Sequence, residues 1–253
     1  MFVTVKKETI IIISIISIII LLCGIFITTG AIAEVMSRND RKIPIYRVET
    51  EEKVIALTFD AAWGADKTEG ILDILQQYNA KSTFFLVGFW IDKFEDEVKL
   101  IDKRGMLIGN HSNNHLKMSL LKEENIVKEL AYVNKRIGEI TGKEVKFFRA
   151  PFGDYNDLLV NTVEAQGMMT IQWDTDSLDW KGLSAKDIKD RVLSRAKNGS
   201  IVLFHNNSDN ILEALPLILL ALKNQGYKFV TLNNLVYKDN YYIDNNGAQH
   251  KKL

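Results

Sequence analysis

The residues of this chain that can act in acid–base chemistry or bind a metal ion fall into five short groups. The first is Thr58-Phe59-Asp60, in which an acid follows an apolar run and can act as a general base. A helix cap or a turn residue is the other interpretation of this aspartate. The second group contains His111 and His115. Their spacing of four can place both imidazoles on one side of a metal ion, although two ordinary surface or core histidines would also account for it.

The third group joins a cation to a turn. Arg149 comes directly after two phenylalanines, and Pro151 and Gly153 follow it. A guanidinium in such apolar surroundings requires an anionic partner, and Asp60 is our candidate. The turn can present backbone N–H groups to a ligand, although a plain turn would contain the same residues.

The fourth and fifth groups add carboxylates and a further histidine. Residues 173–180 carry three aspartates among aromatic side chains, and these carboxylates can orient a histidine or the arginine. A solvated acidic loop is the alternative. His205 ends an apolar run, and the period of two in a strand places it on the same face as Leu203. A histidine in this position can also be an ordinary core residue.

The elements that must position these groups are strands and helices in alternation. β-rich runs alternate with helical patterns up to about Val236, which predicts an α/β fold with a parallel sheet. Each group follows one of the expected strands, so all five should lie at the same end of the sheet, where parallel barrels build their active sites. Seven strands are enough to close, or nearly close, a barrel, and we expect them at Val54–Phe59, Ser82–Val87, Met106–Gly109, Val145–Phe148, Met169–Trp173, Ile201–Phe204 and Phe229–Leu232.

Taken together, in order and type, the five groups resemble the motifs of the polysaccharide deacetylase (NodB-homology) family of carbohydrate esterases. The resemblance covers residues 53–236. It implies a distorted (β/α) barrel and a metal-dependent hydrolase that removes N-acetyl groups from a cell-wall polysaccharide. The matching residues are Thr58-Phe59-Asp60, the pair His111 and His115, Arg149 to Gly153, Asp176 to Trp180, and Leu203 with His205.

The resemblance also implies a role for each matching residue. Asp60 would be the base, kept ionised by Arg149, and His205, oriented by Asp179, would protonate the departing sugar amine. His111 and His115 would hold a divalent ion, with zinc or cobalt expected. The substrate would be contacted by Pro151, Phe152, Gly153, the backbone near Tyr155, which would help stabilise the oxyanion, and Trp180 and Leu203, which would line the pocket for the acetyl methyl group.

The sequence departs from the family pattern at Ala61, where a second aspartate would complete a metal-binding triad with the two histidines. We therefore expect weak metal binding. The following Ala62-Trp63-Gly64 resembles a sporulation-associated branch of the family, whose members commonly lack that aspartate and have an N-terminal membrane segment. A catalytically silent wall-binding module is the rival hypothesis, and an esterase of O-acetyl sugars is a third.

The N-terminus carries an uncharged apolar run, Ile10–Ile27, behind Lys6 and Lys7. Eighteen such residues nearly span a bilayer core of about 30 Å, so we expect residues 1–33 to anchor the chain in a membrane, with the domain outside the cytoplasm. A signal peptide cleaved after Ala33, giving a secreted protein, or a buried core helix are the alternatives. Residues 34–52 are expected to be a linker, and the polar residues 237–253 a disordered tail.

Composition limits the partners of the chain. Its 32 basic and 32 acidic residues leave no net charge, so nothing suggests a nucleic-acid binder. The only cysteine, Cys23, lies in the apolar run, and the remainder therefore has no thiol for a disulfide or a nucleophile. A cell-wall glycan and the membrane are the expected partners, and no protein partner is predicted.

Overall fold

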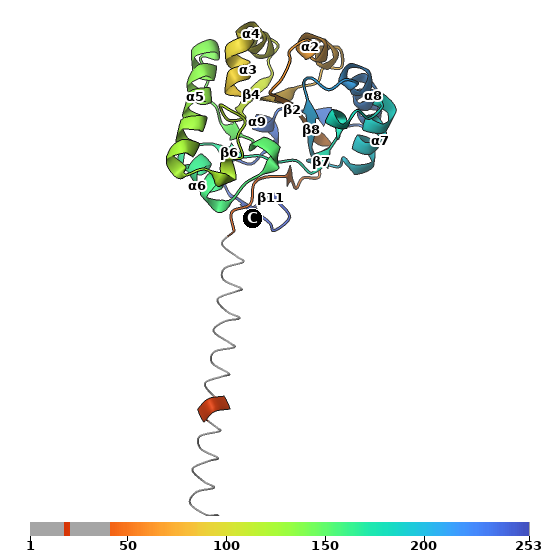
Figure 1. The fold of residues 1–253 in the computed structure, drawn as a ribbon. Coiled ribbons are helices and arrows are strands. Elements are labelled where there is room, and N and C mark those ends of the chain that lie inside the picture. Colours follow the sequence, from red (N-terminus) through yellow and green to blue (C-terminus); the bar gives the residue numbers. More distant parts are fainter. Residues whose placement is uncertain (1–17, 21–40, 253) are drawn as a thin grey trace, which may run out of the picture. The chain divides into compact units, whose positions relative to one another are not determined.

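A curled sheet of parallel strands lies at the centre of the computed structural model, which describes residues 18–20 and 41–252 (Figure 1). Within these residues the strand order is β6-β5-β4-β3-β2-β8-β7, and β9 pairs with the start of β2. The chain runs directly from β6 to β7, which lie at opposite edges, so the curl is left open between them. The strands are β2 (Val54–Ala61), β3 (Ser82–Leu86), β4 (Leu107–Asn110), β5 (Phe147–Phe148), β6 (Met169–Thr170), β7 (Thr175–Asp176), β8 (Ile201–His205) and β9 (Lys228–Phe229).

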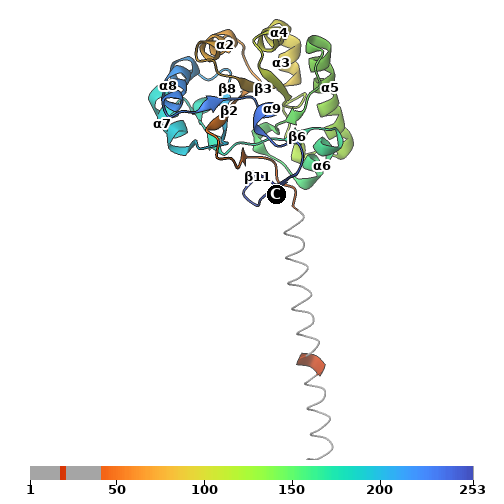
Figure 2. The same ribbon diagram turned by 180° about the vertical axis from the view of Figure 1, so that it is seen from behind.

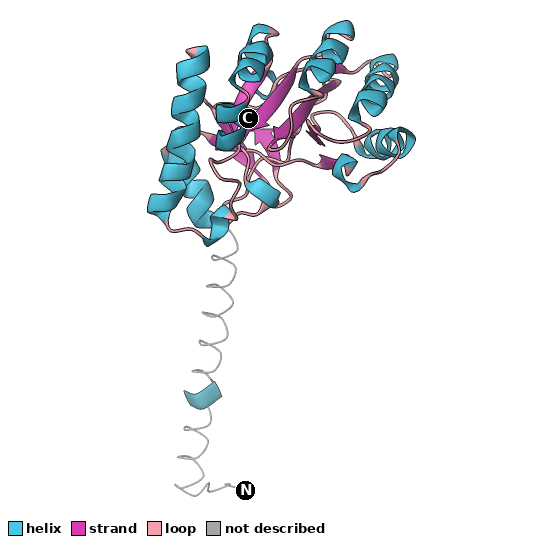
Figure 3. Ribbon diagram, turned by 45° about the horizontal axis from the view of Figure 1, so that its top comes forward, coloured by secondary structure: helices cyan, strands magenta, loops and turns pink. Residues whose placement is uncertain are grey.

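Helices cover the outer face of this sheet, as Figure 3 shows. Figures 1 and 2 place α5 and α6 at one end of the sheet and α7 and α8 at the other. The helices are α2 (Thr68–Gln77), α3 (Gly88–Lys93), α4 (Glu95–Lys103), α5 (Glu123–Thr141), α6 (Asp157–Ala165), α7 (Ala185–Arg195), α8 (Ile211–Asn224) and α9 (Leu232–Leu235), with short 3-10 turns η1 (Met118–Leu120), η2 (Pro151–Gly153) and η3 (Asp179–Lys181).

Strand β2 illustrates how the sequence fixes the two faces of the sheet. Leu57 and Phe59 point toward the helices and belong to the larger apolar cluster, whereas Ala56 belongs to the cluster inside the curl. Because side chains alternate along a strand, Asp60 continues the inner face. The α/β fold expected from the sequence, with an incomplete barrel of parallel strands, is confirmed.

Three of the expected strands differ from those in the structure. The run Val145–Phe148 is strand only at β5. The run Met169–Trp173 is strand only at β6, after which the chain crosses to the far edge and forms β7 inside the acidic segment. The last expected strand shares only Phe229 with β9, and Leu232 instead begins α9.

The expectation of a disordered tail after residue 236 is wrong, and the expected linker is partly structured. Strand β11 (Ala248–Lys251) pairs in parallel with β1 (Arg47–Val48) and antiparallel with β10 (Tyr241–Ile243). Val48 and Ala248 are buried, and the Gln249 amide is satisfied by hydrogen bonds with the backbone of Tyr237. The pairing of β1 with β11 joins residues that are 201 positions apart, and local composition does not reveal such a partner.

The segment before β2 also crosses the open side of the curl. The N–H of Ile45 donates to the carbonyl of Thr170 at one edge, and the N–H of Val48 donates to the carbonyl of Gly199, just before β8. Residues from Lys42 onward thus form one compact unit with the barrel.

The expected membrane anchor lies outside the described residues except for residues 18–20. Among the residues that the structure describes, no helix has the length and apolar character needed to cross a bilayer.

Candidate active site

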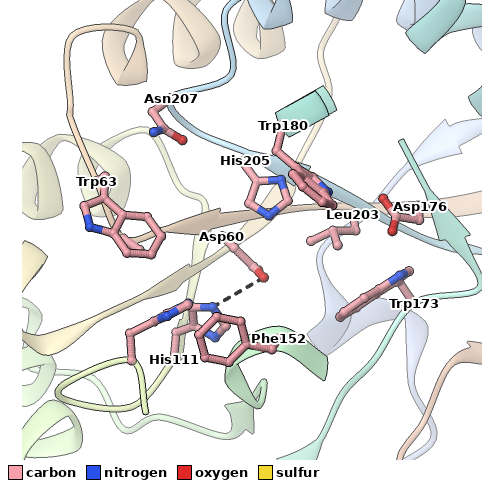
Figure 4. Close-up of a pocket in the computed structure, with 12 residues that line it drawn as sticks. Asp60, Trp63, His111, Phe152, Trp173, Asp176, Trp180, Leu203, His205 and Asn207 are labelled. Carbon is pink, nitrogen blue, oxygen red and sulfur yellow. Dashed lines mark ion pairs between the residues drawn. The ribbon is translucent and has the colours of Figure 1, made fainter. Parts of the chain in front are cut away.

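A pocket of about 470 Å³ opens at the carboxyl ends of the parallel strands (Figure 4). Strands β2, β7 and β8 and the segments that follow β2, β4, β5, β6, β7 and β8 contribute to it, so the sequence expectation that the five groups meet at one end of the sheet is confirmed. Its lining residues are Asp60, Ala62, Trp63, His111, His115, Phe152, Trp173, Asp176, Trp180, Leu203, His205 and Asn207.

An ion pair forms the floor of this pocket. Arg149 donates from Nη1 to Oδ1 of Asp60 at 2.8 Å, and both side chains are buried. The other carboxylate oxygen, Oδ2, lies 3.5 Å from Nε2 of His111. Asp60 and Arg149 are 89 positions apart in the chain, and their contact confirms the anionic partner that the sequence predicted for a guanidinium in apolar surroundings.

The guanidinium of Arg149 is held on several sides. Its Nη2 donates to the carbonyl of Gln172 at 3.1 Å, and its Cζ lies 4.3 Å from the ring centroid of Phe85 and 5.4 Å from that of Trp173. These contacts fix the cation at the position that faces Asp60. The guanidinium therefore provides a permanent positive charge at the floor of the pocket.

The electrostatics of the floor favour an ionised Asp60. Burial raises the pKa of this carboxyl, but the charges of Arg149, His111 and His205 outweigh the burial, so the pKa lies below its ordinary value. An ionised carboxylate in a cleft can accept a proton from water.

The two histidines of the second group lie on a loop that a carboxylate organises. Glu129 of α5 accepts hydrogen bonds from the N–H groups of Asn113 and Asn114 and from the side-chain amide of Asn114. His115 has a left-handed backbone, with φ of 53°, and its N–H donates to Oγ of Ser112. Sequence reasoning missed Glu129, although a carboxylate three residues after Ile126 on the apolar face of a helix was a usable signal.

Both imidazoles have pKa values below the ordinary value for histidine. Nδ1 of His111 lies 2.8 Å from the carbonyl of Arg149, which leaves Nε2 facing Asp60. Burial lowers the pKa of His111, and burial together with the charge of His111 lowers the pKa of His115 to about 4. The rings meet edge to face, with their centroids 5.1 Å apart.

A second acid–base pair lies across the pocket. Asp179 accepts a hydrogen bond from the N–H of His205 at 2.8 Å, and its Oδ1 lies 2.8 Å from Nδ1 of that histidine. Ser208 donates to the carbonyl of Asp179 and so fixes this turn. Burial lowers the pKa of His205, but the hydrogen bond and charge of Asp179 raise it by more, so the pKa lies above its ordinary value.

The substrate contacts expected from the sequence are only partly brought together. Leu203, Trp180 and Phe152 line the pocket, whereas Pro151 and Gly153 are not among its lining residues. Tyr155 is also absent from the pocket lining, and its hydroxyl lies 3.3 Å from that of Tyr46.

The role expected for the backbone near Tyr155, to help stabilise the oxyanion, depends on the orientation of that backbone, which cannot be predicted from the sequence. Lining residues that sequence reasoning did not assign to the pocket are Ala62, Trp63, Trp173 and Asn207. Asp176, which the motif match contained without a role, also lines the pocket, and its Oδ1 accepts a hydrogen bond from the N–H of Leu178.

A parallel half-barrel with two acid–base pairs at the carboxyl ends of its strands defines a hydrolase-like α/β protein, and comparison gives the family. Residues 47–171 match the family model for polysaccharide deacetylase. A peptidoglycan-N-acetylglucosamine deacetylase of Bacillus cereus is 37% identical over 76% of this chain and 92% of its own length. The chain belongs to the polysaccharide deacetylase family.

Other relatives vary in what is known of them. An uncharacterized protein of Bacillus subtilis is 33% identical over 76% of this chain, and the match spans 60% of that relative's length. A crystal structure of a CE4 family pseudoenzyme from Bacillus anthracis has a TM-score of 0.74 and 31% identity, covering 83% of this chain and 73% of that one. A mutant of that pseudoenzyme has restored enzymatic activity.

Deacetylases of this family generally depend on a metal ion, but the described residues do not form a three-ligand site. Across residues 18–20 and 41–252, no three His, Cys, Asp or Glu side chains are arranged to hold an ion. Ala61 is buried and carries no atom that could bind a metal ion. Asp66, another candidate ligand, is largely exposed beside Lys67 and does not line the pocket. Only the two imidazoles and Asp60, whose Oδ1 is bonded to Arg149, remain.

Proposed function

We propose that this chain hydrolyses N-acetyl groups of a cell-wall glycan, with peptidoglycan as the substrate. The observation that carries the proposal is the pairing of two acid–base units at one pocket. Asp60 and His205 are register partners on the adjacent strands β2 and β8, and each is bonded to its own charged partner, Arg149 and Asp179 respectively.

The two units divide the acid and base roles. The lowered pKa of Asp60 keeps its carboxylate ionised and able to accept a proton from the attacking water, and the raised pKa of His205 suits an acid that protonates the departing amine. Amide hydrolysis needs both transfers, because the amine leaves only after protonation. Active sites that use one group as acid and another as base typically have environments that move the pKa values of the two groups in opposite directions.

The pocket walls suit an acetylated sugar. Leu203, Trp173 and Trp180 provide apolar surface for the acetyl methyl group, next to the polar pairs that would act on the amide. The Bacillus cereus relative is a peptidoglycan-N-acetylglucosamine deacetylase, which supports peptidoglycan as the glycan.

We also propose how the protein is placed and what ion it uses. A divalent ion, zinc or cobalt, would be held weakly by His111 and His115, because Ala61 supplies no carboxylate. The apolar run Ile10–Ile27 would tether the domain outside the cytoplasm, and the resemblance of Ala62-Trp63-Gly64 to a sporulation-associated branch supports a role during sporulation.

The rival is a catalytically silent wall-binding module. Ala61 and the pseudoenzyme among the similar structures favour it. The test is acetate release from peptidoglycan and from N-acetylglucosamine oligomers, with zinc or cobalt added, alongside glycan binding in the same preparation. Release that Asp60→Asn abolishes supports the hydrolase, binding without release supports the silent module, and release from O-acetylated glycan alone supports an O-acetyl esterase.

A further inference from the structure

An exposed tryptophan at the mouth of the pocket has no part in the proposed acid–base chemistry. Trp63 lies in the loop after β2, lines the pocket, and is 57% exposed. Figure 4 shows it on the opposite side of Asp60 and His205 from Trp180. A large apolar side chain exposed beside a polar cleft is a common mark of a binding surface.

The backbone around Trp63 is held rigidly. The carbonyl of Gly64 accepts hydrogen bonds from Nε1 of Trp90 at 2.6 Å and from Nδ2 of Asn206 at 2.9 Å. Gly64 has φ of 61°, a left-handed conformation that glycine adopts without strain. Trp63 is thus presented on a fixed turn, which reduces the entropy lost when it binds a ligand.

Neighbouring rings extend the surface of Trp63. Phe89, 38% exposed at the start of α3, has its ring centroid 6.4 Å from that of Trp63. His115 lies 5.0 Å from Trp63 on the pocket side, edge to face. We call the surface of Trp63, Phe89 and His115 the aromatic platform.

The platform is assembled from the loops that follow three consecutive strands. Gly88 and Phe89 donate their N–H groups to the carbonyls of Ser112 and Asn113, which joins the loop after β3 to the histidine loop. A Cβ at Gly88 would lie 2.1 Å from Oδ1 of Asn113, so only glycine permits this approach. The platform is therefore continuous with the loop that carries His111 and His115.

We propose that the aromatic platform is a second sugar-binding site, which takes the pyranose ring next to the one in the pocket. Pyranose rings have an apolar face of C–H groups that packs on aromatic rings, and the platform adjoins the pocket directly. The inference rests on the proposed function, because it assumes that the pocket holds an N-acetylated sugar. The preferred ligand is then an oligosaccharide, and Trp63 sets the preference for chain length.

The test compares ligand lengths on the full-length chain. Affinities for N-acetylglucosamine and its dimer and tetramer are measured by calorimetry for the natural sequence, Trp63→Ala, Trp63→Phe and Tyr242→Ala. Tyr242 is the matched control, because it is 47% exposed on β10 and does not line the pocket. Unfolding midpoints verify that each variant is folded, and acetate release is followed in the same samples.

The expected result is a gain in affinity from monomer to tetramer that Trp63→Ala removes. An aromatic contact of this kind corresponds to roughly 2- to 10-fold in affinity. Monomer affinity should be unchanged, Trp63→Phe should keep part of the gain, and Tyr242→Ala should keep all of it.

Several outcomes would overturn the second site. They are a natural chain whose affinity does not depend on length, a Trp63→Ala variant that weakens monomer and tetramer equally, and a folded Trp63→Ala variant that leaves tetramer affinity unchanged. Acetate release separates this inference from the proposed hydrolase. Loss of the length effect without any acetate release supports the platform and contradicts the enzyme, and acetate release with no length effect does the reverse.

Discussion

Asp60 and His205 stand at register-paired positions at the ends of β2 and β8, so a base and an acid face one pocket from neighbouring strands. Parallel pairing makes this arrangement rigid, because a shift of one residue in either strand would turn its side chain to the helix-facing side. The charged partners of the two residues come from the segments that follow β5 and β7. The division of roles can therefore be tested one residue at a time.

Replacing the base should remove the chemistry and leave the fold. Asp60→Asn keeps an oxygen for Arg149 but cannot accept a proton from water, so we expect acetate release to fall about 10²- to 10⁴-fold. Asp66→Asn, on the exposed loop that follows β2, is the matched control and should retain full activity. A folded Asp60→Asn variant with near-natural activity would assign the base to another residue.

Removing the buried cation should be costly for stability. Arg149→Met leaves the Asp60 carboxyl buried without its ion-pair partner, and breaking such a pair costs about 3–5 kcal/mol in the free energy of unfolding. The pKa of Asp60 should rise, because the burial remains and the largest opposing charge is gone. Lys143→Met removes an exposed ion pair with Asp102 and should cost less than about 1 kcal/mol. Denaturant unfolding measures the free energy of unfolding of both variants, and an equally small decrease in the two would contradict the role of Arg149.

The pH dependence of acetate release should report the two units separately. Asp60 has a lowered pKa and remains ionised on the acid side, whereas His205 has a raised pKa and donates its proton only below that value. Activity should therefore fall as pH rises through the pKa of His205. Asp179→Asn removes the charge that raises this pKa and should move the alkaline limb to lower pH. An alkaline limb that stays in place would mean that another group is the acid.

The same two shifts act on stability in opposite senses. The raised pKa of His205 contributes stability below the pKa of the unfolded histidine, which is lost as pH rises through the folded value. The lowered pKa of Asp60 contributes stability above the unfolded carboxyl value, which is lost as pH falls. Denaturant unfolding should show that the natural chain has a higher free energy of unfolding than Asp179→Asn, and that this difference decreases as the pH rises through the pKa of His205.

Metal binding should be weak in the natural sequence. We expect purified protein to contain substoichiometric metal and added zinc or cobalt to raise acetate release. Ala61→Asp should tighten metal binding about 10- to 100-fold or more, because the loss of residues that only orient the metal ligands already changes affinity by that factor. Metal analysis and calorimetry with zinc measure this. Tight stoichiometric metal in the natural chain would mean that a third protein ligand exists.

The two ends of the chain should differ in what they contribute. Deleting residues 1–40 should leave a soluble domain with cooperative unfolding, because the compact unit begins at Lys42. Deleting residues 241–253 should cost roughly 3 kcal/mol or more, because Ile45 and Val48 lose apolar cover. A stable, cooperative C-terminal deletion would contradict the structural role of β11.

Much of the fold could be read from the sequence because β2, β3 and β8 are apolar runs whose strand character is local. The pairing of Arg149 with Asp60 was predictable from charge, since a buried guanidinium requires an anion. Strand β7 and the β1–β11 pair were not predictable, because a strand of two to four residues depends on its distant partners. The position of Tyr155 was missed for a similar reason, since the direction of a turn is set by what packs against it.

The pairing of β1 with β11 also has a consequence for the order of folding. Arg47 and Ala248 are register partners separated by 201 positions, so this contact closes a long loop and cannot form until Ala248 has been synthesised. Until then Ile45 and Val48 lack their final cover, and the open side of the curl is not yet closed. The newly made chain therefore passes through a stage in which its sheet edges are available to other chains, and exposed strand edges of this kind favour aggregation.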